Sequence, residues 1–103
     1  MYAIAFDLDV DKLKVHYGSS HNNAYGDIRR YFAANGFSNQ QGSLYYGDQT
    51  VTMVGAVVVV ANLAKTYPWL EKCVTDIRIL RRLESDDLMP AVKMGGGLAA
   101  DAS

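Results

Sequence analysis

Three aspartates follow the first hydrophobic run of the chain at alternate positions. The run covers residues 2–6, and it is followed by Asp7, Asp9 and Asp11. An ionised carboxylate at the end of a buried strand costs desolvation energy unless a cation, hydrogen bonds or a partner compensate for it. Because perturbed carboxylates of this kind concentrate at functional sites, Asp7 is the first candidate for metal binding or catalysis.

Two self-contained acidic sites share part of this pattern, but neither is complete. Asp7-Leu8-Asp9 is similar to the first motif of haloacid-dehalogenase-type phosphatases, whose much larger parallel sheet does not fit within 103 residues. A calcium loop counted from Asp7 requires Gly at its sixth position and Glu at its twelfth, where this chain has Lys12 and Gly18. The sequence therefore argues against both types of site.

Zinc and thiol chemistry also find little support. His16 and His21 are the two histidines, and neither has a cysteine or carboxylate at ligand spacing. Cys73 is the one cysteine, which excludes an internal disulfide and fits a reducing compartment. Its apolar neighbours favour core packing over a reactive thiol.

The chain has three groups of arginines that could hold a phosphate backbone. They are Arg29-Arg30, Arg78 and Arg81-Arg82. Each could equally be a solvated or salt-bridged surface group, and Arg78 could simply pair with Asp76. The formal net charge of −1 gives no global attraction to nucleic acid, so any such binding depends on local patches.

Hydrophobic periodicity predicts the elements that must position these side chains. The expected order is a strand at 2–8, a short helix at 9–17, an amphipathic helix ending at 35–36, a split strand or hairpin at 37–46, a helix at 51–65 and a strand at 73–83. In the last strand, Thr75, Ile77 and Ile79 should share one face, opposite a face with Asp76, Arg78 and Leu80.

The segment 51–65 is ambiguous between strand and helix. Its valine run at 57–60 favours a strand by propensity, whereas its apolar residues also recur at helical spacing. Its length favours a helix, which Asp48 or Thr50 could cap. Its longest apolar stretch, 51–64, is too short to span a bilayer, and no signal peptide precedes it, so we expect a cytoplasmic protein.

This order of elements predicts an α+β, ferredoxin-like β-α-β-β-α-β sandwich. In that fold an open antiparallel sheet carries both main helices on one face, and the other face usually needs a partner. We expect a single domain over 1–93. The last ten residues, 94–103, include Gly95-Gly96-Gly97 and are expected to form a flexible tail.

Several short motifs together resemble the virulence-associated protein D (VapD) family, small bacterial toxin-type endoribonucleases. The resemblance covers residues 1 to about 92, and each motif is weak alone while their order and spacing are specific. The motifs are residues 1–8, Tyr17-Gly18, residues 23–29, Gly36-Phe37, residues 41–45 and Asp76-Ile77-Arg78.

The resemblance implies a metal-dependent site shared between two chains. The family is similar in fold to CRISPR-associated protein 2, whose dimers place an Asp from each first strand across a two-fold axis, and Asp7 is the matching position. Two carboxylates at such an axis repel each other, and Mg²⁺ or another divalent cation would relieve that repulsion. The expected assembly is thus a homodimer.

Other site residues follow from the same resemblance. Ser43 matches a serine that could hydrogen-bond a phosphate, although it could also be an ordinary strand residue at a bulge. Tyr25, Tyr45 and Tyr46 could stack on bases of single-stranded RNA, or could pack in the core or an interface. Asp9 is expected to cap a helix before it acts as a site residue.

The implied function is that of a metal-dependent endoribonuclease acting on single-stranded RNA or mRNA. It would be the toxin of a toxin-antitoxin pair, with a protein antitoxin as a possible partner. The alternative is a non-catalytic dimeric adaptor that binds nucleic acid with the same fold. The segment 51–64 is richer in valine than expected for the family, and an exposed face at Ala56, Val58 or Val59 would suit an oligomer or an antitoxin.

Overall fold

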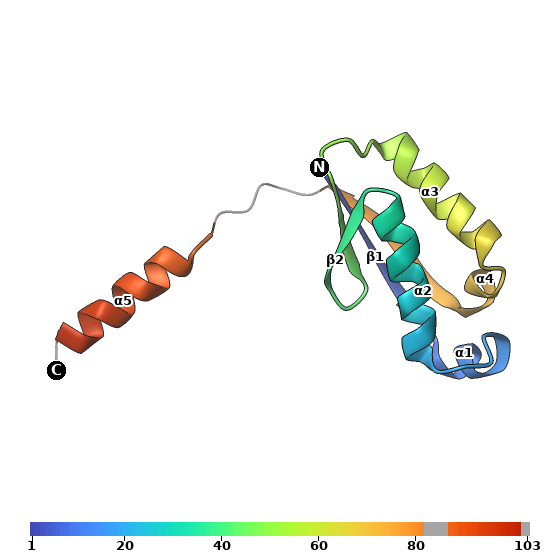
Figure 1. Cartoon of the computed structure of the whole chain (residues 1–103), viewed down its shortest axis with the longest axis horizontal. Helices are drawn as coiled ribbons and strands as arrows, with labels where there is room; N and C mark the ends of the chain where they lie inside the picture. The colour runs from blue at the N-terminus through green and yellow to red at the C-terminus, as the bar shows by residue number, and fades with distance from the viewer. Residues whose placement is uncertain (82–86, 102–103) are drawn as a thin grey trace.

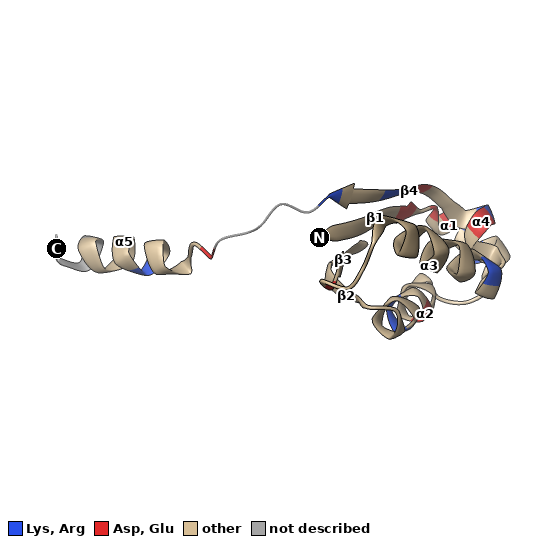
Figure 2. Cartoon of the chain, turned by 90° about the horizontal axis from the view of Figure 1, so that it is seen from above, with Lys and Arg blue, Asp and Glu red and all other residues tan. Residues whose placement is uncertain are grey.

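The chain forms a four-stranded antiparallel sheet in the strand order β2-β3-β1-β4. The computed structural model describes residues 1–81 and 87–101. Helices α2 and α3 cover one face of the sheet, and the short helices α1 and α4 lie together at the end where β1 stops (Figures 1 and 2). This is the ferredoxin-like arrangement predicted from the sequence.

The elements are β1 (Tyr2–Leu8), α1 (Val10–His16), α2 (His21–Ala34), β2 (Phe37–Gln41), β3 (Leu44–Gly47), α3 (Met53–Thr66), α4 (Trp69–Cys73), β4 (Val74–Arg81) and α5 (Met89–Asp101).

The core lies between the sheet and the two long helices. Ile4 and Phe6 of the central strand β1 are buried toward the helices, while Asp7 between Phe6 and Leu8 is exposed. The Phe6 ring stacks on Tyr45 of β3, with their centroids 5.8 Å apart, and Phe32 of α2 lies 4.7 Å from Tyr45. The alternation of side chains along this central strand thus decides which residues of β1 lie on the open face.

Both long helices form where the sequence predicts them. Ser20 caps α2 by accepting a hydrogen bond from the backbone of Asn22 at 3.2 Å. The ambiguous segment is the helix α3, capped by Thr52 and not by Asp48 or Thr50 as expected. Asp48 instead accepts hydrogen bonds from the backbone and hydroxyl of Thr50, which fixes the turn before the helix and lowers the pKa of the Asp48 carboxyl.

Asp9 is the N-cap of α1, as predicted. Its backbone is extended, and its carboxylate accepts a hydrogen bond from the backbone N–H of Lys12 at 3.1 Å. Leu13 of this helix is fully buried beside Ala24 and Cys73 in a small second core, so the cap stabilises a helix that forms part of this core. Asp11 lies in the first turn and makes a long, exposed ion pair with Lys14 at 3.9 Å.

Removing this cap should measurably destabilise helix α1 and the second core to which it contributes. We expect Asp9→Ala to lower the free energy of unfolding by about 1 kcal/mol, because one backbone N–H loses its partner. Asp9→Asn should keep most of that stability, since Asn caps helices as well as Asp does. Urea unfolding followed by circular dichroism measures both, and an equal loss in the two variants would contradict the capping role.

The C-terminal segment differs from the expected flexible tail. Residues Met89–Asp101 form the helix α5, which includes Gly95-Gly96-Gly97 and crosses the domain boundary expected at residue 93. Asp87 accepts a hydrogen bond from the backbone of Met89 at 2.9 Å, and Pro90 sits in the first turn, where its missing N–H needs no partner. Glycine costs about 1 kcal/mol in a helix but does not forbid one. Residues 82–83 of the expected last strand lie outside the described residues.

No helix in the described ranges is long and apolar enough to cross a membrane.

Candidate active site

Asp7 of β1 and Asp76 of β4 lie directly opposite each other in the sheet. Asp7 is exposed and Asp76 is partly exposed, on the face that no helix covers. The expected desolvation of Asp7 is therefore wrong for the single chain, because its carboxylate stays in contact with water. Like charges directly opposite in a sheet destabilise it, so this pair calls for a compensating cation.

One compensating cation is present in the chain. Arg78 donates from Nε to both carboxylate oxygens of Asp76, at 3.0 and 3.2 Å. The register places Arg78 opposite Ala5, on the same face as Asp7, and its side chain is 72% exposed. This ion pair is the one expected from the sequence. Within the described residues, the Asp7 side chain has neither an ion pair nor a hydrogen bond, so its charge is left uncompensated.

A β-bulge sits beside the two aspartates. Asp7 pairs with Asp76 but Leu8 pairs with Val74, which leaves Thr75 as an extra residue in β4. Thr75 is exposed and donates its hydroxyl to the backbone carbonyl of Asp7 at 3.3 Å. Its predicted place on the Ile77 face is therefore wrong. Bulges are common next to active sites, where they redirect side chains.

Ser43 lies close to Asp7 along the sheet but not on its face. It is the second residue of a two-residue turn between β2 and β3, with a positive φ of 52° at Gly42, as a type II′ turn requires. Its backbone carbonyl accepts from Phe6 N–H at 3.2 Å. Ser43 lies opposite Phe6, on the side of the sheet that faces the helices. It is therefore close to Asp7 along the strand but on the opposite face of the sheet.

Two of the three tyrosines predicted to stack on RNA are packed against the core. Tyr45 is 1% exposed, and burial raises the pKa of its hydroxyl, which a hydrogen bond from Arg29 partly opposes. Tyr25 of α2 is half-buried, with its ring 6.1 Å from that of Phe6. Tyr45 thus packs in the core, which is the alternative that the sequence left open for it, and its ring is not exposed to a base. Tyr46 lies opposite Ala3, on the open face.

Arg29 and Arg30 belong to α2, in the layer of helices and not on the open face. Arg30 forms an ion pair with Asp27, which also accepts a hydrogen bond from the Tyr17 hydroxyl at 2.7 Å. That hydrogen bond is the main reason why the pKa of Tyr17 is raised. The predicted RNA-binding arginines are therefore divided between the two faces of the sheet, and Arg78 is the one that accompanies Asp7.

Asp76 is a candidate site residue that sequence reasoning missed. The sequence analysis treated it as a partner for Arg78, and the alternation of 76, 78 and 80 already placed it on the polar face. The missing information was the register between β1 and β4, which are nearly 70 residues apart in the chain. A site shared between strands that are neighbours in the sheet but distant in the sequence becomes visible once that register is known.

The arrangement offers hard oxygen ligands and a fixed cation on an accessible surface. Carboxylate oxygens suit Mg²⁺ and similar divalent cations, and an exposed guanidinium suits phosphate. No group of three or more His, Cys, Asp or Glu side chains that could hold a metal occurs within the part of the chain that the structure describes. Asp7 and Asp76 thus form a two-carboxylate pair that further ligands would have to complete.

Comparison with known proteins agrees with the resemblance found in the motifs. No family model matches the sequence. The chain is 43% identical over 93 residues to Endoribonuclease VapD 2 of Riemerella anatipestifer, covering 89% of this chain and 99% of that protein. It is 44% identical over 94 residues to an Endoribonuclease VapD homolog of Helicobacter pylori, covering 91% and 98%. Endoribonuclease VapD of Dichelobacter nodosus shares 37% identity over 93 residues, covering 90% and 98%.

Identity at this level over nearly the full length of each relative identifies the family. The ferredoxin-like sheet and the Asp7 position agree with what the motifs implied. The chain belongs to the VapD family, whose relatives in these organisms are named endoribonucleases.

Proposed function

We propose that this protein is a metal-dependent endoribonuclease that cleaves single-stranded RNA in the cytoplasm as the toxin of a toxin-antitoxin pair. The observation that carries the proposal is the pair of opposed carboxylates, Asp7 and Asp76, on an uncovered sheet face beside the exposed Arg78. The names of the relatives support RNA as the substrate. The proposal assigns the chemistry to Asp7 and the positioning of phosphate to Arg78.

A divalent cation fits the two carboxylates. Asp7 would hold it and Asp76 would contribute, because both present hard oxygen ligands to solvent. When bound, such a cation supplies positive charge at the scissile phosphate and activates a water or hydroxyl nucleophile. The same charge offsets the repulsion between the opposed carboxylates.

Arg78 is suited to hold the RNA backbone near Asp7. Its Nε is engaged by Asp76, which orients the guanidinium and leaves both terminal amino groups for phosphate oxygens. Its position two residue pairs from Asp7 on the same face brings the bound phosphate to the carboxylate. The Ser43 hydroxyl remains a predicted phosphate ligand, although Ser43 lies opposite Phe6 and not on the Asp7 face.

A homodimer would complete the site. The open face presents small and apolar residues around β1, and no described helix covers it. These residues are Ala5, Leu44, Tyr46 and Leu80, around the buried Ala3. Two such faces related by a two-fold axis would bring Asp7 of each chain toward the other, which supplies the further ligands that one chain lacks.

Removal of the metal tests the proposal directly. Purified protein is incubated with a defined single-stranded RNA in Mg²⁺, then after chelation with EDTA, then after Mg²⁺ is added back. We expect cleavage to fall to background on chelation and to return with the cation. Cleavage that survives chelation would overturn the metal role. A gel shift of the RNA without cleavage under any metal condition would favour the non-catalytic adaptor.

A further inference from the structure

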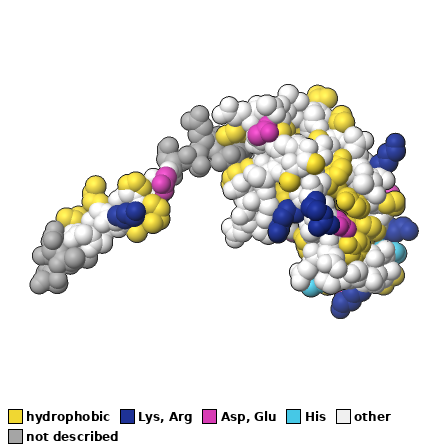
Figure 3. Space-filling model, viewed as in Figure 1, with side chains coloured by type: hydrophobic (Ala, Val, Ile, Leu, Met, Phe, Trp, Pro, Cys, Tyr) yellow, Lys and Arg dark blue, Asp and Glu magenta, His cyan; other side chains and the backbone are white. Residues whose placement is uncertain are grey.

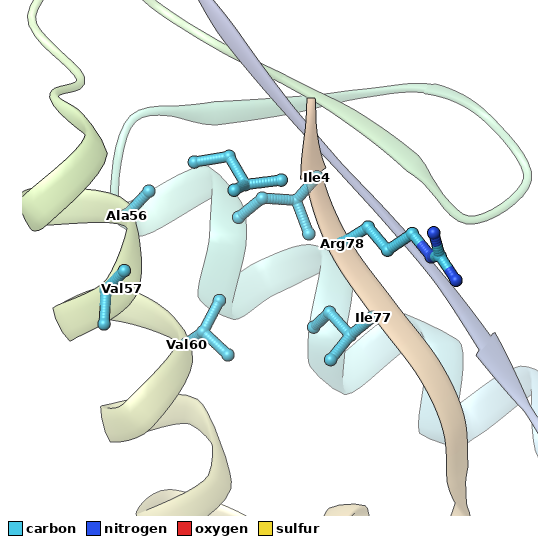
Figure 4. A pocket seen from close by; sticks show the side chains of 7 residues that line it. Ile4, Ala56, Val57, Val60, Ile77 and Arg78 are labelled. Carbon is cyan, nitrogen blue, oxygen red and sulfur yellow. The ribbon is translucent and has the colours of Figure 1, made fainter. Parts of the chain in front are cut away.

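An aliphatic hollow lies between helix α3 and the edge strand β4. Figure 4 shows Val57 and Val60 of α3 facing Ile77 and Ile4 of the sheet across it, while the Arg78 side chain points away from α3. The strand β4 has no neighbour on this side, so the hollow is open along the sheet edge. We call it the α3/β4 groove; Ala56, Ile79 and part of Arg78 complete its lining.

The apolar surface continues from the groove onto the outer side of α3. Val54, Val57 and Val58 are each more than half exposed. The sequence analysis expected an exposed face at Ala56, Val58 or Val59, but Ala56 is buried and Val59 is half-buried against the core. Branched apolar side chains gathered on one helix face are typical of a surface that another element covers.

Helix α5 carries a matching apolar stripe that its own domain does not cover. Leu88, directly before the helix, and Ala91, Val92, Gly95 and Leu98 within it recur at helical spacing, and the three large ones among them are each more than half exposed. Two perpendicular views place α5 well apart from the sheet and its helices (Figures 1 and 2), and Figure 3 shows its apolar side chains in the open. Lys93 lies on the other side of the helix from this stripe.

We propose that α5 of one chain docks in the α3/β4 groove of a second copy of this chain, in a reciprocal exchange of C-terminal helices. An amphipathic helix in an aliphatic groove is a common mode of recognition. The lengths agree, because α5 has 13 residues and α3 has 14, so each extends about 20 Å. Two copies related by a two-fold axis fill two grooves with two helices and leave neither surface open.

The extended shape of the chain favours a second copy as the occupant. The longest dimension is 59 Å, against 31 and 20 Å for the others, because α5 projects from the domain. The radius of gyration is 18.2 Å, whereas a compact chain of this length has about 13 Å. A helix that lies away from the groove of its own chain is placed to reach another chain.

This contact adjoins the proposed RNA site only at Arg78, which lines the groove but directs its guanidinium away from α3. The groove opens on the helix side of the sheet at the β4 edge, whereas Asp7 lies on the opposite face. The exchange therefore does not depend on the proposed nuclease activity. A readout based on cross-linking tests it whether or not RNA is cleaved.

Mixed cross-linking between two full-length variants tests the exchange. Val57→Cys and Val92→Cys chains are mixed and treated with a short bis-maleimide reagent, and products are resolved by mass. Both positions are exposed, so the substitutions leave the core intact. We expect a product of two chains, at least about tenfold more abundant than when Val57→Cys is mixed with the matched control Lys93→Cys. Unmodified protein is the background control, because Cys73 is buried and burial raises the pKa of its thiol.

Three outcomes would overturn the proposal. The first is equal cross-linking of Val92→Cys and Lys93→Cys, which indicates random encounters. The second is no two-chain product. The third concerns the double variant Val57→Cys/Val92→Cys, in which cross-links form within single chains in place of the two-chain product. That result would mean that α5 occupies the groove of its own chain.

Discussion

Asp7→Asn is expected to lower the rate of RNA cleavage by about 100-fold or more while the protein stays folded. The substitution keeps the shape of the side chain but removes the charge that would hold a divalent cation. It also removes one of two like charges that lie opposite each other in the sheet. The melting temperature should therefore stay the same or rise slightly, which separates a lost site from a lost fold.

A matched control is available on α1. Asp11→Asn changes an exposed aspartate four residues away, which makes a single ion pair with Lys14, and should leave cleavage close to that of the unmodified protein. Rates are measured on one defined RNA in Mg²⁺, with thermal melts of the same samples. Full activity of Asp7→Asn would remove Asp7 from the site. In bacteria, induced expression should slow growth with the unmodified chain and not with Asp7→Asn.

Tyr45→Ala is expected to lower the free energy of unfolding by about 3–5 kcal/mol, because it removes a large ring from a close-packed core. The ring lies 4.7 Å from Phe32 and 5.8 Å from Phe6, and it is 1% exposed. Tyr45→Phe keeps these ring contacts, so we expect it to cost less than about 1.5 kcal/mol. Urea unfolding measures both variants.

The result decides between the two interpretations of Tyr45 in the sequence. A core role predicts that Tyr45→Phe also cleaves and binds RNA normally. If Tyr45→Ala were as stable as the unmodified chain and bound RNA more weakly, the stacking role would be restored. Tyr46→Ala is the natural comparison, because Tyr46 is half-buried on the open face and should cost less stability.

Local pattern predicted the elements well because local physics dominates their formation. The apolar run of the first strand, the alternation along residues 76–80 and the apolar stripe that ends before Gly36 needed no knowledge of the tertiary structure. For the segment that forms α3, its length predicted a helix although its valine-rich composition favours a strand, and the structure confirms the helix. The motifs of the family placed Asp7 correctly on the first strand.

The remainder of the site depends on contacts between distant parts of the chain. Asp76 becomes a neighbour of Asp7 through strand pairing, and Thr75 leaves its expected face because of a bulge that no local pattern marks. Ser43 and Arg29 were grouped with Asp7 by motif order, but the sheet separates them by face. The glycine run at 95–97 suggested a tail because glycine is a poor helix former, whereas Asp87 and Pro90 favour a helix start.

The bulge at Thr75 has a consequence for how this chain tolerates change in its length. Ile77 and Ile79 pack on the core at odd positions, and Val74 packs on the same core at an even position, because Thr75 shifts the phase between them. Deletion of one residue here would turn either Val74 outward or Asp76 inward. Substitution of Thr75 leaves that phase intact. Between Cys73 and Asp76, the number of residues therefore constrains the protein more strongly than their identity does.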